Sequence, residues 1–245
     1  MLSTPQNSAP EVTVSPVDAV LASGLAALRQ RIADAALAAG RDVRSVTLLA
    51  VSKGQPVPRL QAALSLGLTQ FGENYLEEAL EKISALAGTA AEWHFIGRLQ
   101  GNKTRPVAEL FSWAHGIDRE RIAQRLSDQR PAASPPLNVC VQVNIAGEAS
   151  KAGVAPDEAL PLLRTVATLP RLRLRGLMCM LPFDLPEAEQ RRYFGRLREL
   201  RDKANAEGLN LDTLSMGMSG DLAAAVAEGA TILRIGTALF GARPK

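Results

Sequence analysis

Two loops near the carboxyl end of the chain are rich in the residue types that bind phosphate. The segment LDTLSMGMSG places Ser219 and Gly220 just past the apolar tip of one predicted strand, and TILRIGTALFG places Gly236 and Thr237 past the tip of the next. Hydroxyl groups and the backbone N–H groups that glycine leaves unshielded form cradles for phosphate oxygens. In a (β/α)8 barrel, the loops after the last two strands are a frequent phosphate site. The two loops therefore predict a phosphate-binding site.

A lysine follows the first predicted strand. Lys53 ends the apolar run LLAVSK, so we expect its side chain at the carboxyl mouth of the barrel, on the same face as the predicted phosphate site. Burial at such a mouth lowers the pKa of a lysine and exposes a nucleophilic amine. An amine beside a phosphate site suits a pyridoxal phosphate Schiff base. It also suits a Schiff-base aldolase with a sugar-phosphate substrate, so this pair alone leaves the ligand open.

An arginine lies within the last predicted strand, two residues before Gly236. Arg234 has isoleucine and leucine neighbours, and it needs a hydrogen-bond acceptor because it stays charged when buried. Two interpretations remain open from the residues alone. Arg234 could face the ring nitrogen of a pyridine cofactor and keep it unprotonated, or it could pair with a barrel carboxylate such as Glu73 or Asp221.

Other polar residues near predicted strand ends have no motif that assigns them. Asn74 follows the second strand, where it could line the mouth or cap a helix. His94 lies between two aromatic residues, and we interpret it as a core histidine. Lys151 follows the fifth strand in GEASKAG and faces either the site or solvent. No group of histidine, cysteine or carboxylate residues has the spacing of a metal site.

The elements that must position these residues alternate regularly along the chain. A helical segment rich in alanine and leucine over residues 17–39 precedes eight strand-to-helix units, counting a short last helix around Leu239. Regular alternation predicts a parallel sheet, and eight units predict closure into a single (β/α)8 TIM barrel, although seven or nine units fit nearly as well. The clearest strand is LNVCVQVNIAG, residues 137–147, and the longest later helix is expected over residues 187–206.

Composition favours one domain and excludes several functions. Residues 1–16 are rich in serine and proline and are expected to form a disordered extension, and residues 17–245 to form the barrel domain. Aromatic residues are only 4% and the net charge is +3 with mixed signs, which argues against nucleic-acid binding. The sequence shows neither a signal peptide nor a membrane-spanning run, and Cys140 and Cys179 have the pattern of reduced, buried residues. We expect a cytoplasmic protein.

Several longer motifs follow one another along nearly the whole chain after Asp18: AVSKGQP, FGENYLEEA, WHFIGRLQGNK, VQVNIAGEASKAG, LRGLMCM, and LSMGMSGD with RIGTALFGAR. In these motifs the chain resembles the YggS/PROSC family of pyridoxal phosphate homeostasis proteins. The resemblance implies one (β/α)8 barrel of the alanine racemase N-terminal-domain type with an extra N-terminal helix. It also implies pyridoxal 5′-phosphate, carried on a lysine as an aldimine.

The resemblance further implies roles for single residues. Lys53 in AVSK would be the Schiff-base lysine, and Arg234 in RIGT would face the pyridine nitrogen. Asn74 in FGEN matches a residue beside the ring, and Lys151 in SKAG matches a lysine at the entrance that helps to transfer or accept the cofactor. The residues that would hold the phosphate are Ser219, Gly236 and Thr237.

The function implied by the resemblance is intracellular vitamin B6 homeostasis without substantial catalysis, with pyridoxal phosphate-dependent apoenzymes as candidate recipients. The alternative is an amino-acid racemase of the alanine racemase type, which uses a lysine and a tyrosine from a partner subunit's second domain. This chain has only Tyr75 and Tyr193, and no second domain is expected after Gly241. An arginine at the ring nitrogen would also weaken the cofactor as an electron sink. A barrel of this kind is expected to be a monomer.

Overall fold

Eight parallel strands close into a barrel in a computed structural model that describes residues 16–148 and 152–241. Neighbouring strands follow the order of the chain, and β8 pairs with β1 to close the barrel. The strands are β1 (Thr47–Val51), β2 (Gln70–Glu73), β3 (Glu92–Phe95), β4 (Trp113–Ile117), β5 (Leu137–Gln142), β6 (Leu172–Met178), β7 (Thr213–Ser215) and β8 (Ile232–Ile235). The predicted (β/α)8 barrel is confirmed.

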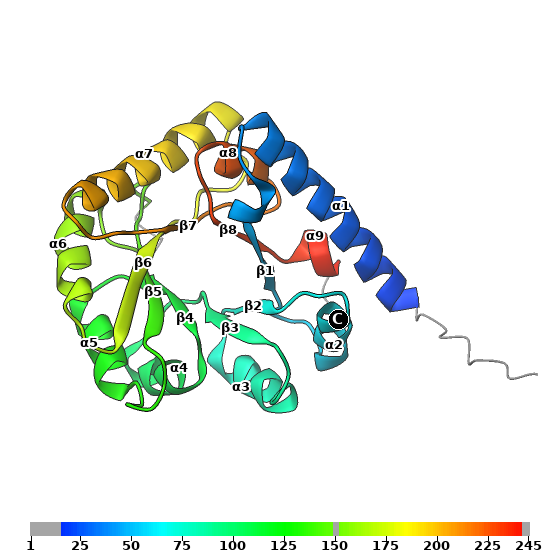
Figure 1. Ribbon diagram of the computed structural model, residues 1–245, viewed down its shortest axis with the longest axis horizontal. Helices are drawn as coiled ribbons and strands as arrows, with labels where there is room; N and C mark the ends of the chain where they lie inside the picture. The colour runs from blue at the N-terminus through cyan, green and yellow to red at the C-terminus, as the bar shows by residue number, and fades with distance from the viewer. Residues whose placement is uncertain (1–15, 149–151, 242–245) are drawn as a thin grey trace, which may run out of the picture.

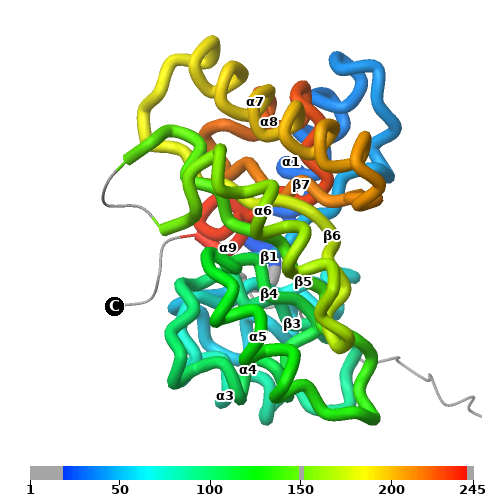
Figure 2. Tube along the Cα trace, turned by 90° about the vertical axis from the view of Figure 1, so that its left-hand side faces the viewer, coloured from blue at the N-terminus to red at the C-terminus, as the bar shows by residue number. Residues whose placement is uncertain are grey.

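Helices surround the strands, as Figure 1 shows in a view along the barrel. Those that follow β1 to β8 in turn are α2 (Val57–Ser65), α3 (Leu76–Ala85), α4 (Thr104–Leu110), α5 (Glu120–Gln129), α6 (Pro156–Ala167), α7 (Glu187–Ala206), α8 (Leu222–Ala227) and α9 (Thr237–Phe240). Short 3-10 helices, η1 (Val43–Ser45) and η2 (Gly101–Lys103), precede β1 and α4. Helices α4, α5 and α6 pack side by side on the face shown in Figure 2. None of the helices in the described ranges is long and apolar enough to cross a membrane.

The additional helix α1 (Pro16–Ala38) covers the seam where the barrel closes, and it packs against α8 and α9 (Figure 1). Leu21, Leu25, Leu28 and Ile32 are buried at the three- and four-residue spacing of one helix face. Gly24 permits a close approach, because a Cβ atom there would lie 3.2 Å from the Leu239 carbonyl oxygen of α9. The extension expected over residues 1–16 lies outside the described residues, apart from Pro16, which begins α1.

Two apolar layers hold the barrel. One fills its interior, and the other, larger layer lies between the strands and the helices. The interior residues alternate along their strands with residues of the outer layer, as expected for a pleated strand. They are Leu49, Val51, Ile96, Trp113, Cys140, Met178 and Ile232. Cys140 and Cys179 are both buried and reduced, as predicted.

Strand β5 is shorter than the predicted strand over residues 137–147. It ends at Gln142, and Asn144 then closes a turn with Glu148. The Asn144 side chain donates to the Glu148 carbonyl oxygen at 2.8 Å and accepts from the Glu148 N–H group at 3.1 Å. Gly147 lies in this turn with φ +74°. Side-chain hydrogen bonds to the local backbone compete with strand pairing, which explains the early end.

Candidate functional site

Lys53 lies just past the carboxyl end of β1 and is half-buried. Leu49 and Val51 point into the barrel, so the two-residue period of a strand carries Lys53 toward the same side, at the carboxyl mouth. Gly54 then turns the chain with φ +72°, and the Gln55 N–H group donates to the Ser52 carbonyl oxygen at 3.0 Å. The predicted position of Lys53 at the mouth is consistent with this geometry.

Helix α3 holds the two neighbours of Lys53 in place. The Lys82 ammonium group donates to the Ser52 carbonyl oxygen at 2.6 Å, and the Gly54 N–H group donates to Glu78 Oε1 at 2.5 Å. Lys82 and Glu78 are themselves an ion pair one helical turn apart. This clamp was not predicted from the sequence, although the i, i+4 spacing of Glu78 and Lys82 is a signal for a pair on one helix face.

Glu73 belongs to the same cluster. Its side chain is fully buried, and its Oε1 atom accepts from Lys82 Nζ at 2.7 Å and from Ser52 Oγ at 2.6 Å. Burial raises the pKa of the Glu73 carboxyl, and the hydrogen bonds from Lys82 and Ser52 oppose that rise. Glu73 therefore faces α3 as a structural partner of Lys82 through its Oε1 atom, while its Oε2 atom is buried without a hydrogen-bond partner in the described structure.

Arg234 points into the barrel and is 5% exposed. Its Nη1 atom donates to the carbonyl oxygen and hydroxyl of Ser215, and its Nη2 atom donates to the Cys179 carbonyl oxygen at 2.7 Å. Arg234 forms no ion pair with Glu73 or Asp221 within the described residues. Glu73 pairs with Lys82, and Asp221 accepts from the Met218 N–H group and acts on Arg234 only through its charge. The bonds to Ser215 and Cys179 use three of the five N–H groups of Arg234, so within the described part of the chain Nε and one N–H of Nη2 are left to donate to a ligand.

The loops after β7 and β8 bring unused backbone donors to the same mouth. The N–H groups of Ser219, Gly220, Gly236 and Thr237 have no hydrogen-bond partner among residues 16–148 and 152–241. Strand β7 pairs with β8, and β8 pairs with β1, so the loops that carry these groups lie next to the loop of Lys53. Unpaired N–H groups that converge at strand ends suit an anionic oxygen group such as a phosphate.

A glycine shapes the loop after β7. Gly217 has φ +97°, and a Cβ atom there would lie 2.6 Å from both Ala225 Cβ and Leu233 Cδ2. We expect Gly217→Ala to lower the free energy of unfolding by about 1–3 kcal/mol, because both the backbone conformation and the space exclude a side chain. Gly220→Ala is the matched control, since nothing lies within 4 Å of its Cβ position. Urea unfolding of the two variants checks this, and equal stabilities would contradict it.

Asn74 extends the mouth to the next strand. It follows β2, the neighbour of β1, and its Oδ1 atom is buried without a hydrogen-bond partner in the described structure. Buried polar atoms are nearly always hydrogen-bonded, so an unpaired acceptor at the mouth suits a donor group of a ligand. The mouth thus gathers Lys53, Asn74, Arg234 and the two donor loops. Lys151, the predicted entrance residue, lies outside the described residues.

The two histidines of the chain lie in the barrel interior, and the prediction of His94 as a core residue is confirmed. Burial lowers the pKa of His94 to about 3, and burial also lowers the pKa of His115 well below its usual value. No group of histidine, cysteine and carboxylate residues in the described ranges could hold a metal ion.

The neutral histidines are expected to make stability depend on pH. Below pH about 6.5 each histidine gains a proton in the unfolded chain but not in the folded chain. Because the unfolded chain then binds more protons, the free energy of unfolding should fall by about 3 kcal/mol between about pH 6.5 and about pH 5. Denaturant unfolding across this range checks the slope. His115→Gln should roughly halve it, and an unchanged slope in that variant would contradict the assignment.

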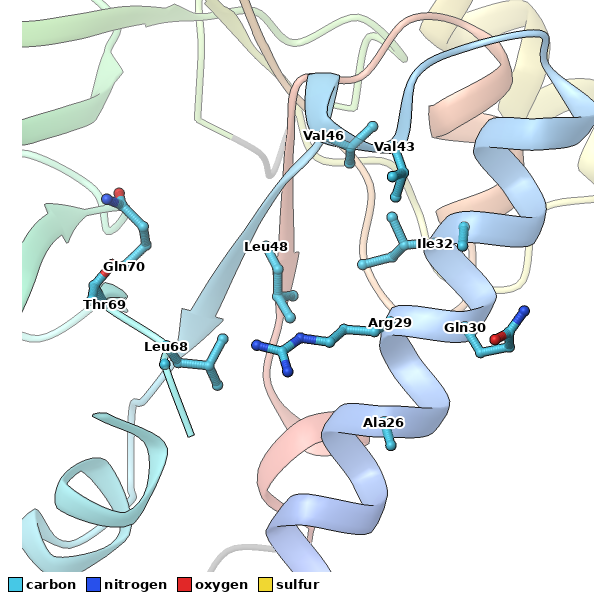
Figure 3. A pocket seen from close by; sticks show the side chains of 12 residues that line it. Ala26, Arg29, Gln30, Ile32, Val43, Val46, Leu48, Leu68, Thr69 and Gln70 are labelled. Atoms are coloured by element: carbon cyan, nitrogen blue, oxygen red, sulfur yellow. The ribbon is translucent and has the colours of Figure 1, made fainter. Parts of the chain in front are cut away.

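A cavity of about 580 Å³ lies away from this mouth, at the amino ends of β1 and β2. Helix α1 forms one wall, and its Arg29 points across the cavity toward Leu68 (Figure 3). Leu48 and Gln70 also line it. Because Lys53 and the donor loops lie at the opposite, carboxyl ends of the strands, this cavity is separate from the candidate site.

The sequence matches a known protein family and named relatives over most of its length. Residues 24–244 match the family described as "Alanine racemase, N-terminal domain". A Pseudomonas aeruginosa protein named "Pyridoxal phosphate homeostasis protein" is 57% identical over 223 residues, which are 91% of this chain and 96% of that protein.

Solved structures agree with this result. PipY of Synechococcus elongatus, in a structure described as having PLP bound, is 34% identical with a TM-score of 0.79, over 90% of this chain and 100% of PipY. Alanine racemase from Corynebacterium glutamicum has a TM-score of 0.72 over 93% of this chain and 62% of its own, but at 17% identity it shows only the shared fold. The chain therefore belongs to the family of pyridoxal phosphate homeostasis proteins, which is built on the alanine racemase N-terminal domain.

Proposed function

We propose that this protein binds pyridoxal 5′-phosphate at the carboxyl mouth of the barrel and holds it for vitamin B6 homeostasis, without substantial catalysis. One observation carries the proposal: the half-buried Lys53 lies beside two loops whose four N–H groups have no partner among the described residues. A primary amine next to an anion cradle suits a ligand that combines an aldehyde with a phosphate. The homologous PipY structure described as having PLP bound supports this choice of ligand.

Different residues of the mouth bind different parts of the cofactor. Lys53 is the attachment point for the aldehyde carbon. The phosphate is assigned to the N–H groups of Ser219, Gly236 and Thr237 and to the hydroxyl groups of Ser219 and Thr237. Arg234 and Asn74 are assigned to the ring. Asn74 Oδ1 is buried without a partner among the described residues, and the hydrogen bonds of Arg234 to Ser215 and Cys179 come from its terminal nitrogens and not from Nε. When bound, the cofactor supplies an electron-withdrawing ring. The Arg234 guanidinium does not give up a proton, so it leaves the ring nitrogen unprotonated. An unprotonated ring withdraws electrons less strongly.

The surroundings of the site favour holding the cofactor over turning over a substrate. Racemisation needs a second acid–base group opposite the lysine. Tyr75 is 59% exposed and Tyr193 lies on the outer helix α7, while Glu73 is engaged with Lys82. The same proposal includes release of the cofactor to pyridoxal phosphate-dependent apoenzymes, with Lys151 at the entrance of the site. It also includes a monomeric state and a cytoplasmic location.

The test is a titration of the purified chain with pyridoxal 5′-phosphate, followed by visible absorbance, and then a racemisation assay of the loaded protein with L-alanine. We expect uptake of one cofactor per chain and a racemisation rate no higher than that of the free cofactor. Pyridoxal without its phosphate is the control, and it should bind more weakly because it leaves the N–H cradle unfilled. Equal binding of the two ligands, or rapid racemisation, would contradict the proposal.

A further inference from the structure

A continuous hydrogen-bonded chain crosses the barrel interior and ends on Arg234. His94 Nε2 lies 2.5 Å from Gln70 Oε1, and His94 Nδ1 lies 3.0 Å from His115 Nε2. His115 Nδ1 lies 2.8 Å from Ser215 Oγ, which accepts from Arg234 Nη1 at 2.9 Å. These five residues come from β2, β3, β4, β7 and β8, so the chain links one side of the barrel to the other.

Glu92 fixes the direction of the bonds at the far end. Its carboxylate accepts from Trp113 Nε1 at 3.0 Å and from Gln70 Nε2 at 2.5 Å. The amide of Gln70 therefore presents its oxygen to His94, and an amide oxygen can only accept a hydrogen bond. It follows that the ring of His94 carries its proton on Nε2.

The proton position on His94 then determines the proton positions on His115 and Ser215. Both histidines are neutral, because burial holds their pKa values far below neutral pH, and a neutral imidazole has a single N–H group. His94 Nδ1 must accept, so His115 donates from Nε2 and accepts at Nδ1. Ser215 must then donate its hydroxyl proton to His115.

The Arg234 end of the network gives the same donor-to-acceptor direction. A guanidinium group can only donate, so Ser215 Oγ accepts from Arg234 while it donates to His115. The hydrogen-bonded network thus ends on an acceptor, the Gln70 amide oxygen, and on a donor, the Arg234 guanidinium. One arrangement of protons satisfies every bond between them. Trp113 stacks on His94 with an interplanar angle of 7°, which fixes the plane of that ring.

We propose that Ser215, His115 and His94 are positioning residues that lock the guanidinium of Arg234 and thereby tune the ring of the bound cofactor. The network and the Cys179 carbonyl oxygen use three of the five N–H groups of Arg234, on both terminal nitrogens, and leave Nε and one N–H of Nη2 as its remaining donors. This inference rests on the proposed function, because it needs a cofactor ring at Arg234. The lock itself is a property of the protein without the cofactor.

The first measurement is the protonation state of the two imidazoles in the full-length protein, by long-range ¹H–¹⁵N correlation NMR. The chain has only two histidines, so each signal is assigned by a single variant, His94→Gln or His115→Gln. Both rings are expected to carry their proton on Nε2 and to stay neutral between about pH 5 and about pH 8. A proton on Nδ1 of either ring, or titration in this range, would overturn the assignment.

The second measurement is the visible spectrum of the protein loaded with pyridoxal 5′-phosphate, for Ser215→Ala and Ser215→Thr. The alanine variant should shift the absorption maximum, because Arg234 loses one acceptor and His115 loses its donor. Threonine keeps the hydroxyl and should restore the maximum. Thr213→Val is the matched control. Thr213 lies two residues before Ser215 on β7 and is also buried, but its hydroxyl donates to Asp212, which is not part of the hydrogen-bonded network that ends on Arg234.

The outcomes separate this inference from the proposed function. If the wild-type protein takes up no cofactor, the proposed function fails and this inference fails with it. If the wild type takes up the cofactor but Ser215→Ala gives the same spectrum as wild type, Ser215→Thr and Thr213→Val, the positioning role is overturned alone. Should Ser215→Ala not fold, His115→Gln takes its place, and an unshifted spectrum of that variant overturns the role in the same way. A shift with alanine that threonine reverses supports it.

Discussion

Replacing Lys53 with alanine is expected to abolish covalent uptake of pyridoxal 5′-phosphate and with it the visible absorption band of the loaded protein. The phosphate cradle and Arg234 remain in this variant, so weak binding should persist. We expect the free energy of binding to fall by at least about 3 kcal/mol, which is more than about a hundredfold in the dissociation constant. Equilibrium dialysis, together with the absorbance of the retained ligand, measures both effects.

Lys103→Ala is the matched control for this experiment. Lys103 ends η2 just before α4, its side chain is 26% exposed, and it forms an ion pair with the exposed Glu77. Its replacement should leave cofactor uptake unchanged and cost little stability. Should Lys53→Ala retain the visible band while Lys103→Ala loses it, the attachment point would have to be reassigned.

Replacing Lys82 with methionine is expected to destabilise the fold by about 3–5 kcal/mol, because it leaves the buried carboxylate of Glu73 without its partner. The variant should also loosen the turn around Lys53, since Lys82 donates to the Ser52 carbonyl oxygen. Burial already raises the pKa of Glu73, so protonation of this carboxyl relieves part of the penalty at low pH. The loss should therefore be larger at pH 8 than at pH 5. Denaturant unfolding at both pH values measures it.

A double variant separates charge from packing in this cluster. Glu73→Gln in the Lys82→Met background removes the unpaired charge and should recover part of the stability, because replacing both partners is less costly than removing one. Lys103→Met, which breaks the exposed pair with Glu77, should cost less than about 1 kcal/mol. A Lys82→Met variant as stable as Lys103→Met would show that the buried pair contributes nothing.

Local sequence patterns are sufficient to predict the elements and the strand-end residues of this protein. Helix α7 begins and ends at the predicted residues, 187 and 206, since its charged outer face and apolar inner face follow one helical period. Lys53, Asn74 and Gly236 follow strands of a parallel barrel, whose carboxyl ends meet at one mouth. Sequence order and strand period therefore place them together without any knowledge of packing.

Contacts between distant elements could not be predicted in this way. The pairing of Glu73 with Lys82 depends on how far α3 is rotated against β2, and the link from His115 to Ser215 joins residues 100 positions apart. Arg234 shows the consequence: its burial was evident from its neighbours, but the partners considered for it were a cofactor ring nitrogen or a carboxylate. Its bonds to the carbonyl oxygens of Ser215 and Cys179 and to the Ser215 hydroxyl were not predicted. Such choices depend on strand tilt and register in the closed barrel.

Borohydride reduction of the loaded protein, followed by peptide mapping, tests the central claim most directly. Reduction converts the attachment into a stable bond, so the labelled peptide identifies the lysine. One pyridoxyl group per chain on the peptide that contains Lys53 is the predicted result. A protein that takes up no label, or a label that maps to Lys103 or Lys151 while Lys53 stays unmodified, would contradict the account.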